Sequence, residues 1–182
     1  MKSNASMQSR FLHLIPYSTT RSLAVAYNEA VKAVDSSVEW ILFTDADVMF
    51  LTPNYGSLLT EAIERYPEAG LLTCTTNRIG AAGQLTEAGK MNTSDLLELR
   101  KVALERLQRF GSATTKINPP VSGLFMLFRR TAWEAVGGFK GDGLYGVDWR
   151  FSHELHDAGF PIYRMDGLFV AHFYRMDGKG AI

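Results

Sequence analysis

The sequence lacks several features that would point to a particular compartment or class of partner. It has one cysteine, Cys74, so no disulfide can form within the chain, which favours a reducing compartment. Nineteen basic residues offset nineteen acidic ones, which argues against binding nucleic acid through a general basic field. No apolar run is long enough to span a bilayer, and residues 1–10 carry no apolar signal-peptide core. We therefore expect a soluble, cytoplasmic protein with no integral membrane segment and no nucleic-acid partner; a peripheral position at a membrane is compatible with this.

The composition is that of an ordinary globular domain. Hydrophobic residues make up 46% of the 182 residues and charged residues 21%, and no linker-like stretch divides the chain. The length suffices for one domain with a substantial core. We expect this domain at residues 11–176, preceded by a disordered start at residues 1–10 and followed by a short tail at residues 177–182.

Short apolar runs alternate with stretches of helical periodicity. The expected strands span residues 11–15, 39–44, 70–75, 123–129, 161–165 and 168–172, and the expected helices span residues 21–34, 58–66, 94–110, 131–136 and 148–158. Residues 77–92 are rich in glycine and polar side chains and predict a long loop, where functional segments are common. The run at 39–44 is almost wholly apolar, as is typical of a strand buried on both faces in a parallel sheet. The pattern predicts an α/β domain with a mainly parallel central sheet flanked by helices.

Two aspartates follow the apolar run at 39–44. Asp45 and Asp47 are two residues apart, so in an extended chain their carboxylates point the same way. Two close carboxylates repel each other unless a cation or a proton lies between them, and oxygen ligands suit Mg²⁺ or Mn²⁺. The alternative is that Asp45 caps a turn while Asp47 faces solvent. We favour the metal interpretation because the pair lies between two apolar segments.

Several motifs, in order along residues 11–175, together resemble the GT-A glycosyltransferases of the family-2 type. They are His13–Ser18 (HLIPYS), residues 43–53 (FTDADVMFLTP), residues 120–126 (PVSGLFM) with residues 133–139 (WEAVGGF), residues 145–150 (YGVDWR), and residues 169–172 (FVAH). The resemblance implies a metal-dependent enzyme that moves a sugar from a nucleotide-diphosphate donor to an acceptor hydroxyl. It implies a single GT-A-like domain and a glycan, lipid-linked or protein acceptor.

The resemblance also implies roles for individual residues. Asp45, Asp47 and His172 would hold Mn²⁺ or Mg²⁺, and Asp148 would be the catalytic base of an inverting transfer. The donor-binding set would be Pro16, Tyr17, Ser18, Asn28, Asp45, Arg78, Ser122 and Gly123. Glycine at position 123 would let a sugar approach the backbone, whereas Arg78 fits a phosphate contact and a solvated surface position equally well. The alternative for Asp148 is a helix N-cap, and a histidine among apolar residues is often a core side chain.

Three other interpretations remain open. Family-2 enzymes usually have a further strand after the first helix, with an acidic residue that helps to hold the nucleobase, and this chain continues directly to the Asp45 segment. It is therefore also compatible with a catalytically degenerate domain that binds a sugar or a partner protein. A phosphatase of the haloacid dehalogenase type would use Asp45 as nucleophile, but Val48-Met49 replaces the glycine and threonine of that pattern. A nucleotidyltransferase would need a glycine-rich basic loop, and residues 16–21 match it poorly.

Overall fold

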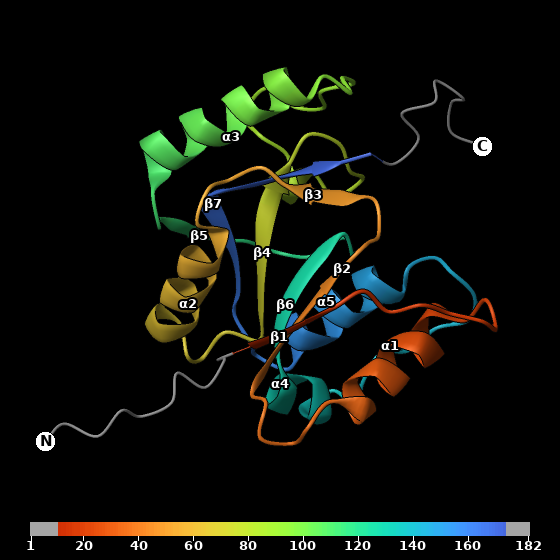
Figure 1. Ribbon diagram of the computed structural model, residues 1–182. Coiled ribbons are helices and arrows are strands. Elements are labelled where there is room, and N and C mark those ends of the chain that lie inside the picture. Colours follow the sequence, from red (N-terminus) through yellow and green to blue (C-terminus); the bar gives the residue numbers. More distant parts are fainter. Residues whose placement is uncertain (1–10, 174–182) are drawn as a thin grey trace, which may run out of the picture.

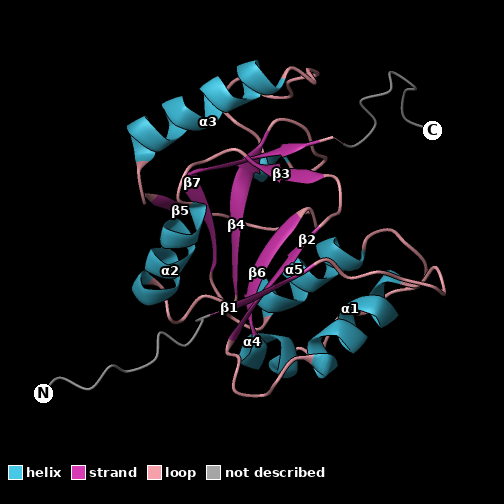
Figure 2. Ribbon diagram, viewed as in Figure 1, coloured by secondary structure: helices cyan, strands magenta, loops and turns pink. Residues whose placement is uncertain are grey.

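A mixed sheet of seven strands forms the centre of the described part of the chain, residues 11–173 of the computed structural model, and helices cover both faces (Figures 1 and 2). The strands are β1 (Phe11–Leu14), β2 (Trp40–Thr44), β3 (Val48–Phe50), β4 (Leu71–Thr76), β5 (Thr114–Lys116), β6 (Phe125–Arg129) and β7 (Ile162–His172). The helices are α1 (Leu23–Ala33), α2 (Tyr55–Arg65), α3 (Leu96–Phe110), α4 (Arg130–Ala135) and α5 (Val147–Asp157), with a short 3₁₀ turn at Ala82–Gln84. The predictions for residues 1–10, 174–176 and 177–182 lie outside the described residues.

The α/β class is confirmed, but the prediction of a mainly parallel sheet is wrong. The strand order is β1-β2-β6-β4-β7-β3, with β5 paired to β7. Only the β1–β2 and β4–β7 pairs are parallel, whereas β2–β6, β4–β6, β3–β7 and β5–β7 are antiparallel. A continuous apolar run indicates only that both faces of a strand are buried. Helices that bury the two faces do not determine whether the neighbouring strand is parallel or antiparallel. Strand β6 lies between β2 and β4 at the centre of the sheet and is antiparallel to both.

The side chains of β2 show how both faces of the sheet become buried. Ile41 and Phe43 pack into a core with helices α1, α4 and α5, while Trp40 and Leu42 pack with helix α2 on the other face. Figure 1 shows α1, α4 and α5 on one side of the sheet and α2 and α3 on the other. All five residues of β2 are buried, so the sheet gives a rigid support to the loop that follows Thr44.

The last two predicted strands, at residues 161–165 and 168–172, form the single long strand β7. Its register with β4 shifts between the Cys74–Met165 and Thr75–Phe169 pairs, which explains why the sequence pattern is interrupted there. Gly167 lies in this irregular segment, and a Cβ at that position would collide with the carbonyl of Gly111. The absence of a side chain therefore allows the loop after α3 to pack against β7. Across residues 11–173, no helix combines the length and the hydrophobicity needed to cross a membrane.

Candidate metal centre and adjoining cavity

Asp45 and Asp47 lie in the short turn between β2 and β3, and the backbone around them is anchored on both sides. The Asp45 amide donates to the carbonyl of Leu124, 3.2 Å away, and β3 begins directly after Asp47. Strand β3 is only three residues long and pairs antiparallel with the end of β7. The pattern of the sequence does not predict β3, because three residues are too few to show a periodicity.

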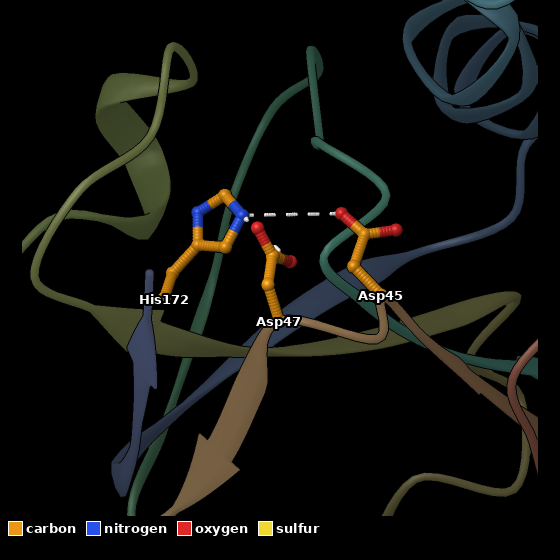
Figure 3. A group of neighbouring side chains, drawn as sticks. All are labelled: Asp45, Asp47 and His172. Carbon is orange, nitrogen blue, oxygen red and sulfur yellow. Dashed lines mark ion pairs between the residues drawn. The ribbon is translucent and has the colours of Figure 1, made fainter. Parts of the chain in front are cut away.

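The β3–β7 ladder brings His172 to the two aspartates. Val48 is paired with His172, and the Phe173 amide donates to the Asp47 carbonyl at 3.0 Å. Figure 3 shows the three side chains pointing toward one another from the end of β2, the start of β3 and the end of β7. The β3–β7 ladder thus places His172 beside two aspartates that precede it by more than 120 residues in sequence.

The spacing of the three side chains fits a divalent cation. His172 Nε2 lies 3.5 Å from Asp47 Oδ1 and 4.0 Å from Asp45 Oδ2, and one ligand atom from each residue lies within 4.8 Å of the others. Metal–oxygen distances of about 2.1 Å place two ligands of one ion roughly 3 to 4.2 Å apart. Two carboxylates and one imidazole form a donor set that Mn²⁺ accepts well, and Mg²⁺ is suited to the carboxylates.

The surroundings of His172 orient its ring for such a role. Its Nδ1 lies 2.8 Å from the carbonyl oxygen of Arg78, which can only accept, so Nδ1 carries the proton and Nε2 faces the aspartates. The side-chain amide of Asn77, at the end of β4, accepts from the His172 amide at 2.8 Å and donates to the His172 carbonyl at 3.3 Å. A histidine that donates its second ring N–H to a carbonyl is the usual arrangement of a metal ligand.

The charges of the cluster are strongly coupled. Burial, and then the Asp47 carboxylate, raise the pKa of Asp45, while the contact with His172 lowers the pKa of Asp47. Burial by itself would lower the pKa of His172, but the Asp47 carboxylate, the Arg78 carbonyl and Asp45 outweigh burial and raise it. In the described residues, no hydrogen bond reaches the Asp45 carboxylate, so a proton or a cation must compensate the repulsion between the two acids.

A cavity of about 640 Å³ adjoins this cluster. Asp45 and His172 line it, together with Asp148. The other lining residues are Leu23, Tyr27, Ile79, Gly80, Ser122, Gly123, Leu124, Leu144, Tyr145, Gly146 and Trp149. This volume lies within the range of ordinary ligand pockets. One cavity therefore joins two of the three predicted metal ligands to the predicted catalytic base.

Asp148 lies in the first turn of α5 and not at its N-cap, which is Gly146 with φ of 75°. The alternative interpretation of Asp148 as an N-cap is therefore wrong. Its Oδ2 accepts a 2.6 Å hydrogen bond from the amide of Gly123, which comes from the loop before β6. Burial raises the pKa of Asp148, and the hydrogen bond from Gly123 opposes this shift. The carboxylate is thus held in one orientation at the wall of the cavity and is a stronger base than an exposed aspartate.

Gln84, within the predicted loop at 77–92, anchors the segment that holds Asp148. Its buried amide accepts from the Ser122 amide at 2.7 Å and donates to the Ser122 carbonyl at 3.2 Å and to Thr73 Oγ1 at 2.8 Å. The indole N–H of Trp149 donates to the Ser122 hydroxyl at 3.1 Å. The sequence pattern does not single out Gln84 or Trp149 as site residues; only their positions, beside glycines and beside Asp148, hint at a role.

Five residues of the predicted donor-binding set are absent from the lining of the cavity: Pro16, Tyr17, Ser18, Asn28 and Arg78. The side chain of Tyr17 is 84% exposed, and the Ser18 hydroxyl bonds to the backbone of Ser22 at the start of α1. The Arg78 carbonyl is used by His172. Asp45, Ser122 and Gly123 do line the cavity.

Asn28 has a structural role in this arrangement. Its Oδ1 accepts from the indole of Trp133 at 3.1 Å and from the amide of Phe139 at 2.9 Å, and its Nδ2 donates to the Phe139 carbonyl at 2.8 Å. These bonds tie α1 to the glycine-rich turn after α4. The side-chain amide is therefore committed within the protein, and the geometry gives no support to a donor contact by Asn28.

Comparison with known proteins adds no assignment at this point: no model of a protein family matches the chain, and no curated protein matches its sequence. What can be concluded about the site rests on its own geometry.

Proposed function

We propose that the chain is a metal-dependent glycosyltransferase of the GT-A type, which transfers a sugar from a nucleotide-diphosphate donor to an acceptor hydroxyl. The observation that carries the proposal is the Asp45–Asp47–His172 cluster, which opens into the same cavity as the half-buried Asp148 carboxylate. A cation-binding group and a fixed base in one pocket are the two elements that this transfer needs.

The cluster supplies the donor end of the site. Asp45, Asp47 and His172 would hold the ion, and the carbonyl of Arg78 keeps the His172 ring in position. Such an ion, when bound, neutralises the charge that develops on the diphosphate leaving group as the sugar bond breaks. Either Mn²⁺ or Mg²⁺ is compatible with these ligands.

Asp148 supplies the acceptor end. Its carboxylate accepts the proton of the acceptor hydroxyl as that oxygen attacks the anomeric carbon, and the Gly123 amide holds the carboxylate in place. The raised pKa of Asp148 makes it a better base at neutral pH than an exposed aspartate. A single base opposite the leaving group corresponds to inversion at the anomeric carbon.

The mouth of the cavity offers an apolar surface to the acceptor. Leu144, Tyr145 and Trp149 line the cavity and are exposed, and the Trp149 ring is fixed by its bond to Ser122. Aromatic faces of this kind pack against the C–H faces of sugar rings, and the surface equally suits a lipid-linked or a protein acceptor.

The proposal is tested by a thermal-shift panel of UDP-, GDP- and dTDP-sugars with Mn²⁺, on the wild type and on Asp47→Asn. We expect one nucleotide class to stabilise the wild type in a metal-dependent way and to have no effect on the variant. Asp157→Asn, which changes an exposed carboxylate that does not line the cavity, is the control and should behave as the wild type.

An assay of nucleotide release and a test for phosphorylation by a phosphate ester separate the alternatives. Stabilisation without release of nucleotide, even with acceptors present, indicates a degenerate sugar-binding domain. Transient phosphorylation of Asp45 by a phosphate ester indicates a phosphatase. If no donor shifts the wild type with either Mn²⁺ or Mg²⁺, the proposed transferase function is wrong.

A further inference from the structure

Tyr27 is a buried tyrosine of helix α1 whose side chain forms part of the cavity wall. The residue is 3% exposed, and its ring packs on Phe43 and Phe139 at centroid distances of 5.1 and 4.9 Å. These contacts fix the ring within the core on one side of the sheet. They would be equally available to phenylalanine, so packing does not explain the hydroxyl.

The hydroxyl of Tyr27 points to the part of the cavity that contains Asp148. A Cβ placed on Gly123 would lie 3.2 Å from Tyr27 Oη and 3.4 Å from Asp148 Oδ2, so both oxygens face the same glycine. Across residues 11–173, no protein group forms a hydrogen bond with this hydroxyl. The oxygen does not belong to the enclosed side-chain atoms that lack a partner among the described residues, so it opens into the cavity, where a ligand can pair with it.

The electrostatic surroundings determine which kind of partner the hydroxyl can take. Burial, together with the carboxylates of Asp45 and Asp148, raises the pKa of Tyr27 far above its ordinary value. The phenol therefore stays protonated and can donate a hydrogen bond, and it can also accept one. A ligand group that bears both a lone pair and a proton, such as a sugar hydroxyl, would satisfy both Tyr27 and the adjacent carboxylate.

We propose that Tyr27 is a sugar-binding residue, whose hydroxyl donates a hydrogen bond to a hydroxyl of the donor sugar. This assignment rests on the proposed function. Asp45 belongs to the cation cluster and Asp148 is the base. Tyr27 lines the same cavity as both, and its hydroxyl faces the same glycine as the Asp148 carboxylate, so the phenol borders the space through which the transferred sugar would pass. A donor group that faces the cavity and has no partner among the described residues discriminates against sugars that lack the matching hydroxyl.

The test is Tyr27→Phe, which keeps the ring and removes only the hydroxyl. We expect the affinity for the nucleotide-sugar, and kcat/KM, to fall about 10-fold, the cost of one unpaired hydrogen-bonding group in a site. The affinity for the same nucleoside diphosphate without its sugar should stay within about 2-fold of the wild type. The unfolding temperature should not fall, because the hydroxyl has no partner within the described part of the protein.

Tyr163→Phe is the matched control, because its phenol donates to Glu68 at 3.1 Å and Tyr163 does not line the cavity. This variant should bind the nucleotide-sugar as the wild type does. A set of deoxy-sugar donors extends the test: the analogue that lacks the contacted hydroxyl should bind wild type and Tyr27→Phe equally well.

The outcomes distinguish the assignment from the function on which it rests. Equal nucleotide-sugar affinity for Tyr27→Phe and wild type overturns the role of Tyr27 while the transferase function stands. A lower unfolding temperature with unchanged affinity shows a structural hydroxyl and also overturns it. An equal loss for the nucleoside diphosphate and the nucleotide-sugar places the contact on the nucleotide and overturns the assignment of Tyr27 to the sugar. If the wild type binds no nucleotide-sugar with Mn²⁺ or Mg²⁺, both the function and the assignment are wrong.

Discussion

Three carboxylates lie in or beside the cavity, and they form two regions with different surroundings: Asp148 alone, and the pair Asp45 and Asp47. Asp148 is held by the amide of Gly123, which in turn lies next to a segment anchored by Gln84. Asp45 and Asp47 instead face each other and His172, and the Asp45 carboxylate receives no hydrogen bond from the described residues. The Asp148 carboxylate is thus paired with a backbone donor, whereas the carboxylates of Asp45 and Asp47 each have a like charge as a neighbour.

This difference separates a proton-accepting group from a cation-binding group. A backbone N–H orients a carboxylate without neutralising it, so Asp148 keeps free lone pairs, and burial keeps its pKa raised although the Gly123 hydrogen bond opposes this shift. Two carboxylates beside an imidazole are stabilised most by a positive ion. The two regions should therefore respond differently to mutation, to pH and to metal, and the following predictions test that difference.

The largest expected effect is on turnover in Asp148→Asn. The amide oxygen of asparagine can still accept from Gly123, but it cannot take a proton, so kcat should fall between about 100-fold and 10,000-fold. Metal-dependent binding of the nucleotide should change by less than about 3-fold. Both are measured by a coupled assay of nucleotide release and by calorimetry, with Asp142→Asn in the adjacent exposed loop as control. Loss of nucleotide binding in Asp148→Asn would contradict the separation of the two regions.

The next effect is on metal affinity in Asp47→Asn. Changing a residue that only supports a metal ligand typically weakens metal binding by about 10- to 100-fold. Asp47 is itself a proposed ligand, so removing its charge should weaken Mn²⁺ binding by more than about 100-fold. Nucleotide binding should be lost in parallel, unlike in Asp148→Asn. Titration of Mn²⁺ by electron paramagnetic resonance measures the first effect directly. Unchanged Mn²⁺ affinity would show that the cluster is not the binding site.

The third prediction concerns pH. His172 has a pKa raised above its ordinary value of 6.5, so without metal its stabilising contribution is complete below pH 6.5 and is lost as the pH rises through the folded-state pKa. Mn²⁺ competes with that proton, so its affinity should rise about tenfold per pH unit up to the same pKa. NMR titration of the imidazole and thermal melts at pH 6 and 8, with and without Mn²⁺, measure both trends. In Asp47→Asn the pKa of His172 should fall; an unchanged pKa would exclude this coupling.

The smallest effect on ligand binding is expected for Asn28→Ala. Three hydrogen bonds to Trp133 and Phe139 are lost, so the free energy of unfolding should fall by about 1 to 3 kcal/mol. Donor affinity, measured well below the unfolding transition, should be unchanged. Glu29→Ala, on the exposed side of the same helix, is the control for both measurements. A selective loss of donor affinity would restore Asn28 to the donor-binding set.

Local pattern was sufficient to locate most elements of the fold. The apolar run at 39–44 and the helical spacing at 94–110 correspond to β2 and α3 within one or two residues. Strands β3 and β5, with three residues each, carry no readable period, and both form by pairing with β7. The direction of β6 was likewise not predictable, because strand direction depends on which neighbour forms the hydrogen bonds.

The residues of the candidate site likewise divide into those that the sequence indicated and those that it did not. The spacing of Asp45 and Asp47 after a buried strand indicated a carboxylate pair, and the resemblance added His172 and Asp148. The expected contacts of Pro16, Tyr17, Ser18, Asn28 and Arg78 with a donor find no support in the lining of the cavity. Gln84 and Tyr27 were missed, since a glutamine in a loop and a tyrosine on an apolar helix face carry no local sign of the groups they meet.

The order of residues alone thus determines the α/β class, the buried strand that ends in Asp45-Ala46-Asp47 and the balance of charge, because these depend on neighbours in sequence and on composition. Tertiary structure alone decides that His172 meets the two aspartates, that Gly123 holds Asp148 and that the Tyr27 hydroxyl faces the same cavity. Each of these contacts joins residues at least 25 positions apart, and their distances follow from strand pairing and helix packing, which no local window of sequence contains.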